Sequence, residues 1–436
     1  MKVSYKPQTT VLLVIIFFFQ QVVHAQIKDD NLIFKNGESL VWIGNSITHQ
    51  CRYSQYIEDY IFTRFPDLRL HLHTAGVSGD KAGNVLIRFD RDIARHEPNY
   101  ATILLGMNDG SYRTFDKAVF ETYQKDMLSL LNKLDSIGTK PIIMSPTMFD
   151  AKQKRSTGSY SDESYLNEYN GLLAYYSAWL REVAREKEYR FIDLRASLEK
   201  ITSEKRKFEK DFTLIPDGIH PSPVGLAVMA TDIIKDFFGD SPLSEILITM
   251  EGRKKGTSNA KGGQINNLAF TGKEIKFEFL PESLPWVIPD DASNGLILAH
   301  ADLLNSEPLT ITGLSRGNYK LFVDSIEIGS FTDLEFAKGI ELNKYTMLPH
   351  YQHSKSIADL NRQRNVEIYK SRELWFQKKM LQEKAKIIEG DEEDNQKALI
   401  DLDTKAGICL GNAERILQKI YQSNSPKKRI YKIVKQ

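Results

Sequence analysis

The sequence has few cysteines: its 436 residues contain only Cys51 and Cys409, too few for a disulfide framework. We expect Cys51 to be buried as a small apolar side chain. Whether these two cysteines form a disulfide bond stays open, because the sequence alone does not place them within bonding distance. An excess of charge is also absent, since 58 basic and 57 acidic residues leave a formal net charge of +1. That balance predicts no nucleic-acid partner and no electrostatic attraction to a membrane.

Long apolar runs are absent after the N-terminus. Residues 1–25 contain Lys2 and Lys6 near their start, continue with an apolar stretch over residues 11–19, and end in the small-residue pattern Val23-His24-Ala25. This order is typical of a secretory signal peptide, and an uncleaved N-terminal anchor is the alternative. No later stretch is long and apolar enough to span a bilayer. We therefore expect an exported protein, periplasmic or extracellular, with no stable membrane insertion after cleavage.

Strand and helix patterns alternate through residues 26–240, the predicted catalytic domain. Five strands are expected, at residues 39–44, 68–74, 100–105, 141–144 and 190–193. Five helices are expected between and after them, at residues 53–65, 82–96, 115–137, 164–188 and 224–238. Alternation of this kind predicts right-handed crossovers, so the fold class is α/β, with a parallel sheet between two helical layers.

Residues 241–348 are expected to form a small antiparallel β-rich accessory unit. Residues 274–279 alternate apolar and charged side chains, which is typical of a half-buried strand. Apolar stretches at residues 309–314 and 319–323 flank Gly317-Asn318 and predict a hairpin, which a further strand continues.

Residues 349–436 are expected to be a helical C-terminal region, with a break at residues 390–395. The acidic run at residues 391–394 lacks the ligand spacing and the glycine of a calcium loop, so an exposed interhelical loop is expected there. A basic cluster near the end is expected to be a solvated tail: Lys427, Lys428, Arg429 and Lys432.

Ser46 follows the first predicted strand, within the stretch Gly44-Asn45-Ser46. A serine hydroxyl is a weak nucleophile until a neighbouring base takes its proton. Alone, a serine in this place is more often a turn or helix-capping residue. The stretch also differs from the nucleophile elbow of α/β-hydrolases, because Thr48 stands where that motif has its second glycine. A catalytic serine therefore needs partners elsewhere in the chain.

Candidate partners lie in the loops of the same predicted sheet. Asp217 and His220 precede the last helix and offer the orienting carboxylate and the general base of a triad. Gly79 follows the second strand and Asn108 the third, and both can donate hydrogen bonds to an oxyanion. Each of these residues alone is also compatible with a turn. Together they are expected at one sheet edge, beyond the carboxyl ends of the strands.

Four blocks resemble, in order and spacing, those of the SGNH (GDSL-type) serine hydrolases: Gly44-Asn45-Ser46, Ser78-Gly79-Asp80, Gly106-Met107-Asn108-Asp109 and Asp217-Gly218-Ile219-His220-Pro221. The resemblance covers residues 38–240 and implies a flavodoxin-like, three-layer parallel sheet. It also implies a catalytic triad, formed by Ser46, Asp217 and His220. The oxyanion donors that it implies are Ser46, Gly79 and Asn108.

These features predict an exported carboxylic-ester hydrolase that removes acyl groups, above all acetyl, from carbohydrate. The alternatives are a lysophospholipase-like or thioesterase-like lipid esterase, and an inactive hydrolase fold that binds carbohydrate. His71, His73 and His96 lack a metal-ligand spacing, so we predict neither a metal nor another cofactor. His49 is expected to point away from the Ser46 hydroxyl and to line the substrate mouth.

Overall fold

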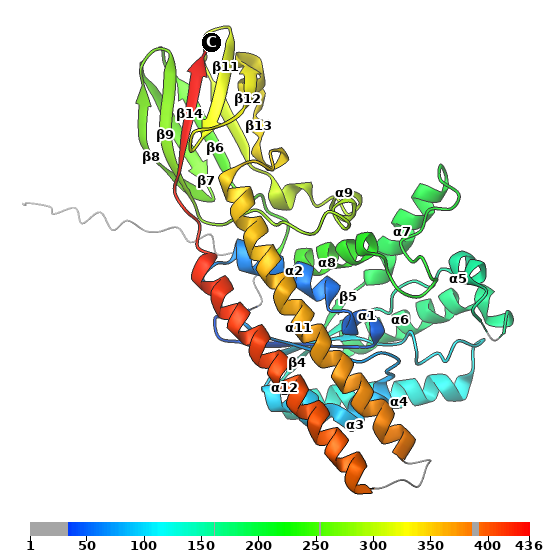
Figure 1. Cartoon of the computed structure of the whole chain (residues 1–436). Coiled ribbons are helices and arrows are strands. Elements are labelled where there is room, and N and C mark those ends of the chain that lie inside the picture. The colour runs from blue at the N-terminus through cyan, green and yellow to red at the C-terminus, as the bar shows by residue number, and fades with distance from the viewer. Residues whose placement is uncertain (1–33, 161, 253, 386–391) are drawn as a thin grey trace, which may run out of the picture.

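The computed structural model of the chain (Figure 1) describes four ranges of residues: 34–160, 162–252, 254–385 and 392–436. The expected signal peptide, residues 1–25, lies outside these ranges. The expected interhelical loop is only partly covered, because residues 386–391 are not described and a helix begins at Glu392. Among the helices of the described ranges, none is both long and apolar enough to cross a membrane.

The first sheet has five parallel strands in the order β2-β1-β3-β4-β5. Their bounds are β1 Ser39–Gly44, β2 His71–Gly76, β3 Tyr100–Leu104, β4 Lys140–Met144 and β5 Arg190–Ile192. β1 lies between β2 and β3, so that Leu40 pairs with Leu72 on one side and with Tyr100 on the other. A parallel sheet in this order is flavodoxin-like, so the predicted α/β fold class is confirmed.

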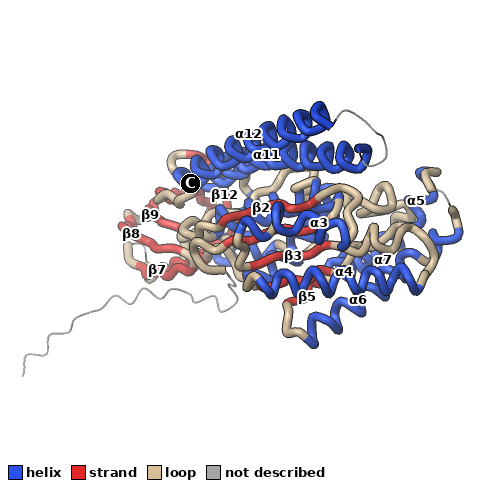
Figure 2. Tube along the Cα trace, turned by 90° about the horizontal axis from the view of Figure 1, so that it is seen from below, coloured by secondary structure: helices blue, strands red, loops and turns tan. Residues whose placement is uncertain are grey.

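Helices cover both faces of the parallel sheet, because successive side chains of a strand point to opposite faces. In β1, Leu40 and Trp42 belong to one buried core, while Val41 and Ile43 belong to the other. The first core is completed by α2 Arg52–Arg64, α7 Leu194–Arg206 and α8 Pro223–Phe238. The second core is completed by the helices seen in front of the strands in Figure 2: α3 Ala82–Asp92, α4 Lys117–Ser136 and α6 Tyr169–Glu186.

Two further sheets share one apolar core. One has the order β13-β10-β6-β7, with β6 Glu245–Met250, β7 Gly256–Lys261, β10 Pro308–Thr312 and β13 Ile340–Glu341. The other has the order β12-β11-β14-β9-β8, with β8 Gly263–Phe270, β9 Glu274–Pro281, β11 Asn318–Val323, β12 Ile326–Thr332 and β14 Arg429–Lys435. The expected β-rich region is present, but β6 and β10 pair in parallel, so it is not purely antiparallel.

The hairpin predicted around Gly317-Asn318 is wrong. β10 pairs with β6 and β13, whereas β11 pairs with β12 and β14 in the other sheet. Leu309 and Leu321 reach the shared core from different sheets, so the chain crosses between the sheets at this turn. The hairpin lies one strand later, between β11 and β12. There Asp324 and Ser325 both have positive φ, which the favoured two-residue hairpin turn requires.

The predicted solvated tail is also wrong, because Arg429–Lys435 forms the strand β14 between β9 and β11. Tyr431 and Ile433 are buried in the shared core, with period-two spacing. The lysine of the opposite face is paired rather than free, since Lys432 lies 3.0 Å from Glu274 of β9. The helical pattern therefore ends before the C-terminus, and the last strand returns to the β-rich region.

Short helices connect these elements: α1 Ser46–His49, α5 Ala151–Thr157, α9 Asn294–Leu298 and α10 Asp333–Lys338. The segment around α9 returns to the first core, where the Trp286 indole N–H donates to the Tyr56 carbonyl oxygen at 2.8 Å. Both cysteines are free, and Cys51 is buried as predicted.

Two long helices, α11 Pro349–Ala385 and α12 Glu392–Ser423, pack together and run along the catalytic part of the chain (Figure 1, Figure 2). α11 lies against α2 and the edge strand β2. Arg364 of α11 pairs with Glu58 at 2.8 Å, and Asn361 Nδ2 donates to Asp59 Oδ1 at 2.8 Å. All four side chains are buried. These pairings fix the register of α11 on α2, since a buried polar group without its partner is costly.

Asp59 gives this contact a measurable pH dependence. Its carboxyl is fully buried, its Oδ2 lacks a hydrogen-bond partner in the described ranges, and burial raises its pKa well above 3.8. A group with a raised folded-state pKa stabilises the fold most below its unfolded pKa, and that contribution is lost as pH rises through the folded pKa.

Asp59→Asn should therefore gain stability relative to the wild type as pH rises. We expect the difference in free energy of unfolding to grow by at least about 1 kcal/mol between pH ~4 and pH ~8, because the variant has no buried carboxyl to ionise. Urea unfolding at the two pH values measures it. Asp67→Asn, at an exposed position just after α2, is the matched control. A difference that does not change with pH would contradict the raised pKa.

Candidate active site

Ser46 is the first residue of α1, directly after β1. The turn between them is tight: a β carbon on Gly44 would lie 2.1 Å from Thr48 Oγ1, so only glycine fits there. Asn45 caps α1, since its side-chain oxygen accepts the Ile47 N–H at 3.1 Å. The local sequence thus places the Ser46 hydroxyl just beyond the carboxyl end of β1.

His220 reaches Ser46 from the loop before α8. Its Nε2 lies 2.8 Å from Ser46 Oγ, and its Nδ1 lies 2.7 Å from Asp217 Oδ2. The Asp217 carboxylate also accepts the backbone N–H groups of Ile219 and His220, at 2.9 and 2.7 Å. Ser222 then caps α8, accepting the N–H of Gly225 at 3.2 Å, which holds the loop against the helix. The three predicted triad residues therefore form one hydrogen-bonded chain.

The charge of Asp217 decides the tautomer of His220. Partial burial would raise the pKa of Asp217, but the hydrogen bonds from the His220 ring and from the backbone N–H groups of His220 and Ile219 hold it well below its usual range. An ionised carboxylate can only accept, so it takes the Nδ1–H of the imidazole. Nε2 then has a free lone pair toward the Ser46 hydroxyl, which is the arrangement needed to take its proton.

Gly79 and Asn108 stand at the same edge, and both face the cavity of Ser46. Gly79 has φ +77°, a left-handed conformation that favours glycine, and its N–H has no acceptor in the described ranges. The Asn108 amide is oriented by two bonds: its oxygen accepts from the Tyr112 hydroxyl at 2.8 Å, and Nδ2 donates to Asp80 O at 3.0 Å. One N–H of that amide is left for a ligand.

The cavity at Ser46 has a volume of about 460 Å³. Ten residues line it, and among them there is no aliphatic side chain: Ser46, His49, Gln50, Ser78, Gly79, Asn108, Tyr112, His220, Tyr369 and Glu373. A larger cavity, of about 620 Å³, lies at the opposite edge, where β3, β4 and β5 begin, and contains none of these groups. We place the candidate site at the smaller cavity because the hydrogen-bonded chain opens there.

His49 lines the cavity and bonds to Ser78, as expected of a residue turned away from the Ser46 hydroxyl. Its Nδ1 accepts the Ser78 N–H at 3.0 Å, so its proton lies on Nε2, 3.1 Å from Glu373 Oε1. Burial, and secondly the charge of Arg372, lower the pKa of His49 to about 4. His49 is therefore neutral near pH ~7.

Several site residues had no signal strong enough to be singled out from the sequence. Asp109 is buried and accepts the N–H groups of Ala82 and Gly106, at 2.8 and 2.9 Å, which ties two loops of the site together. Burial raises its pKa to about 6. Tyr369 and Glu373 come from α11, far along the chain, and only the tertiary packing of that helix brings them to the cavity.

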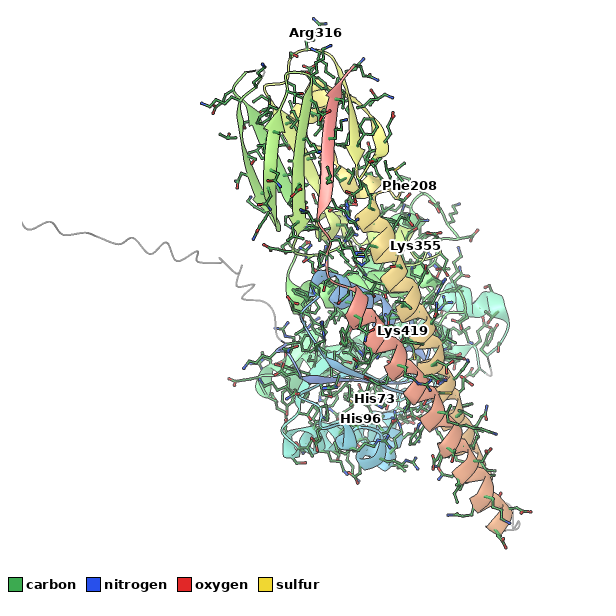
Figure 3. All side chains as sticks on the ribbon, turned by 60° about the vertical axis from the view of Figure 1, so that its left-hand side comes forward. His73, His96, Phe208, Arg316, Lys355 and Lys419 are labelled. Atoms are coloured by element: carbon green, nitrogen blue, oxygen red, sulfur yellow. The ribbon has the colours of Figure 1, made fainter. Side chains whose placement is uncertain are left out.

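His71, His73 and His96 form a separate group. His73 and His96 stack with ring centroids 3.6 Å apart, and Figure 3 shows them side by side near the two long helices. With His71 they line another cavity, between the edge strand β2 and α11 and α12. His73 Nε2 lies 3.2 Å from Asp92. In the part of the chain that the structure describes, no cluster of three or more His, Cys, Asp or Glu side chains is arranged to hold a metal ion.

Comparisons with known proteins agree with this geometry. Residues 42–228 match the GDSL-like Lipase/Acylhydrolase family. An acetylxylan esterase of Geobacillus stearothermophilus is 22% identical over 228 residues, which cover 46% of this chain and 94% of that protein. The solved structure of BT4096, a gut microbial diltiazem-metabolizing enzyme, matches with a TM-score of 0.78 and 26% identity, over 93% of this chain and 99% of its own. These comparisons support an ester hydrolase of the SGNH (GDSL-type) family, which the four blocks resemble, with the matching region at residues 42–228.

Proposed function

We propose that this protein is an exported serine esterase that removes O-acetyl groups from carbohydrate. The observation that carries the proposal is the hydrogen-bonded chain Ser46–His220–Asp217, which opens on a cavity lined without aliphatic side chains. The match of residues 42–228 to a family of lipases and acylhydrolases supports ester hydrolysis as the reaction. The acetylxylan esterase among the relatives supports acetylated carbohydrate as the substrate class.

In the proposed reaction, Ser46 Oγ attacks the carbonyl carbon of the ester while His220 Nε2 takes the hydroxyl proton. The Asp217 carboxylate stabilises the imidazolium that forms. The tetrahedral intermediate then breaks its bond to the alcohol oxygen, which receives the proton from His220, and an acetyl ester remains on Ser46. A water molecule, deprotonated by His220, attacks this ester and releases acetate, and Ser46 recovers its proton from His220.

The negative charge of the tetrahedral intermediate would lie among three donors: the N–H of Ser46, the N–H of Gly79 and the Asn108 amide. The Ser46 N–H is in the first turn of α1 and has no acceptor within that helix. The bonds from Tyr112 and to Asp80 hold the amide before the substrate arrives. Donors held in place in this way stabilise the transition state without reorganisation, and each is typically worth about 10²–10³-fold in kcat.

The walls of the cavity favour a polar substrate over a lipid. A long acyl chain gains binding energy by burying its methylene groups, at about 0.8 kcal/mol each. Among the described residues that line the cavity, aliphatic side chains are absent, and the large apolar groups that such a chain could contact are the rings of Tyr112 and Tyr369. A lysophospholipase-like or thioesterase-like activity is therefore less well supported. A carbohydrate-binding protein without activity is also less well supported, because the hydrogen bonds of a working triad are all present.

Export is part of the proposal and rests on the sequence. Residues 1–25 have the charge, the apolar stretch and the small residues of a signal peptide.

Ser46→Ala tests the nucleophile. The variant should lose at least about 10⁴-fold in kcat/KM on para-nitrophenyl acetate, because no other group can form the acyl-enzyme. A serine-directed organophosphonate should label the wild type at Ser46 and leave the variant unlabelled. Ser203→Ala, at an exposed position on α7, is the matched control and should keep full activity. Turnover by a folded Ser46→Ala protein would contradict the serine mechanism.

A substrate panel tests the acyl group and the alcohol. Acetylated xylo-oligosaccharides and para-nitrophenyl acetate should be hydrolysed, and para-nitrophenyl octanoate should have a kcat/KM lower by at least about tenfold, because the lining has no aliphatic side chains against which its acyl chain could pack. Release of acetate and of para-nitrophenol gives the rates. A preference for octanoate would favour the lipid-esterase alternative. Activity on the aryl acetate without activity on acetylated oligosaccharides would remove carbohydrate from the proposal.

A further inference from the structure

α11 completes the wall of the cavity at Ser46 with two side chains, Tyr369 and Glu373. They are four residues apart, so they lie on the same face of the helix, one turn from each other. Tyr369 also approaches His49, with ring centroids 5.6 Å apart. The helical C-terminal part of the chain therefore borders the space in which a substrate would bind.

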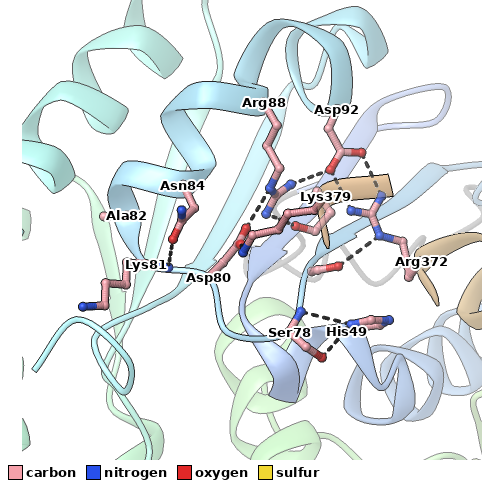
Figure 4. Close-up of polar contacts among 12 residues, drawn as sticks. His49, Ser78, Asp80, Lys81, Ala82, Asn84, Arg88, Asp92, Arg372 and Lys379 are labelled. Atoms are coloured by element: carbon pink, nitrogen blue, oxygen red, sulfur yellow. Dashed lines mark hydrogen bonds and ion pairs between the residues drawn. The ribbon is translucent and has the colours of Figure 1, made fainter. Parts of the chain in front are cut away.

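Buried ion pairs hold α11 in this position (Figure 4). Arg372 is 1% exposed, donates to both carboxylate oxygens of Asp92 at 2.8 and 2.7 Å, and donates through Nε to the Gly76 carbonyl oxygen at 3.0 Å. Two turns further on, Lys379 lies 2.7 Å from the buried Asp80. Because Arg372 precedes Glu373 in the sequence, these bonds fix both the register and the rotation of the helix where it meets the cavity.

Glu373 carries the one acidic side chain among the described residues that line the cavity, and no lysine or arginine is among them. Its Oε1 lies 3.1 Å from His49 Nε2, and its carboxylate also has a hydrogen bond with the side chain of Tyr369. Burial keeps the His49 imidazole neutral near pH ~7 by lowering its pKa to about 4. The nearby cations Arg372 and Lys379 are paired with Asp92 and Asp80. The wall of the cavity is therefore negative at Glu373, where the side chain is 37% exposed.

The size of the cavity assigns this wall to the alcohol portion of the substrate. An acetyl group fills only a small part of about 460 Å³, and volumes of this order accommodate ligands of drug size. The oxyanion donors and the nucleophile hold the ester carbon at Ser46. The rest of the space, with Glu373 and Tyr369 on its wall, is available to the leaving alcohol.

We propose that Glu373, held by α11, selects the alcohol portion of the substrate: its carboxylate accepts hydrogen bonds from the hydroxyl groups of a neutral sugar and favours cationic over anionic alcohols. This inference rests on the proposed function, because it takes the acyl group at Ser46 to be small. A carboxylate suits a sugar, since it accepts from hydroxyl donors and such charge-assisted bonds are stronger than neutral ones.

Two aryl acetates of matched size test the selection by charge: meta-(trimethylammonio)phenyl acetate and meta-carboxyphenyl acetate. The quantity is the ratio of their kcat/KM values, in which any change common to both esters cancels. Glu373→Gln should lower the ratio of cationic to anionic ester by about tenfold at low ionic strength, because one unit charge near the leaving group is removed. In the wild type, added salt should reduce the same ratio.

Further variants make the result specific. Glu373→Lys should reverse the preference toward the anionic ester. Glu383→Gln makes the same substitution at an exposed position of α11, ten residues and about 15 Å further along, and should keep the wild-type ratio. Circular dichroism and thermal unfolding check that each protein is folded.

A ratio within about twofold of the wild type in folded Glu373→Gln and Glu373→Lys would overturn the inference. An equal loss on both esters would also overturn it, since Glu373 would then act through His49 on the reaction itself. The carbohydrate proposal fails separately. A wild type that hydrolyses both aryl acetates but no acetylated xylo-oligosaccharide would remove the sugar, while the ratio would still report the charge preference of α11.

Discussion

The buried ion pair between Arg372 and Asp92 joins the C-terminal helices to the catalytic sheet. Burial alone would raise the pKa of Asp92, but Arg372, His73 and Arg88 hold it well below its usual range, so the carboxylate is ionised. Such a pair adds little net stability, since both charges lose their hydration. Its effect is geometric, because removing either partner would leave a buried charge unpaired, and α11 has only one register that satisfies it.

The position of α11 also affects the loop of Gly79 and the Asn108 amide, the proposed oxyanion donors. Asp80 is fully buried and bonded by Arg88 Nε at 2.8 Å and by Lys379 Nζ at 2.7 Å. The carbonyl oxygen of the same residue accepts from the Asn108 amide. The loop that contains Gly79 is thus held on one side by α3 and on the other by α11. In this chain the proposed oxyanion donors therefore depend on a helix outside residues 42–228, the segment that matches the family model.

The chain leaves the β-rich region and returns to it at its last strand, so the parts of the fold are connected more than once. After the parallel sheet the chain builds most of the β-rich region, returns along the catalytic part as α11 and α12, and ends in β14. β14 lies between β9 and β11, so the last residues complete a sheet begun far earlier in the sequence. Asn424, just after α12, donates to the carbonyl oxygen of Phe62 in α2 at 2.9 Å before the chain enters β14. The similarity to BT4096 extends over 93% of this chain, with a TM-score of 0.78, so the overall fold is shared beyond the parallel sheet.

The sequence alone determined the parallel sheet and the residues of the candidate triad. Apolar periodicity identifies the strands of such a sheet, and parallel strands bring their carboxyl ends to one edge. Ser46, His220 and Asp217 could be named because each lies in a recognisable local sequence pattern. The topology of the sheet then brings these patterns to the same edge. The same patterns placed Gly79 and Asn108 there.

Pairing between distant segments was decided only by the tertiary structure. The hairpin at Gly317-Asn318 was predicted from local turn chemistry, but its two strands, β10 and β11, belong to different sheets. Their buried side chains enter the shared core from those two sheets. β14 was hidden by its basic residues, of which Lys432 is paired with Glu274 of the adjacent strand β9. Glu373 gave no local signal at all. Its role depends on where a long helix packs, and that is set by buried contacts such as Arg372 with Asp92, whose two residues are separated by most of the chain.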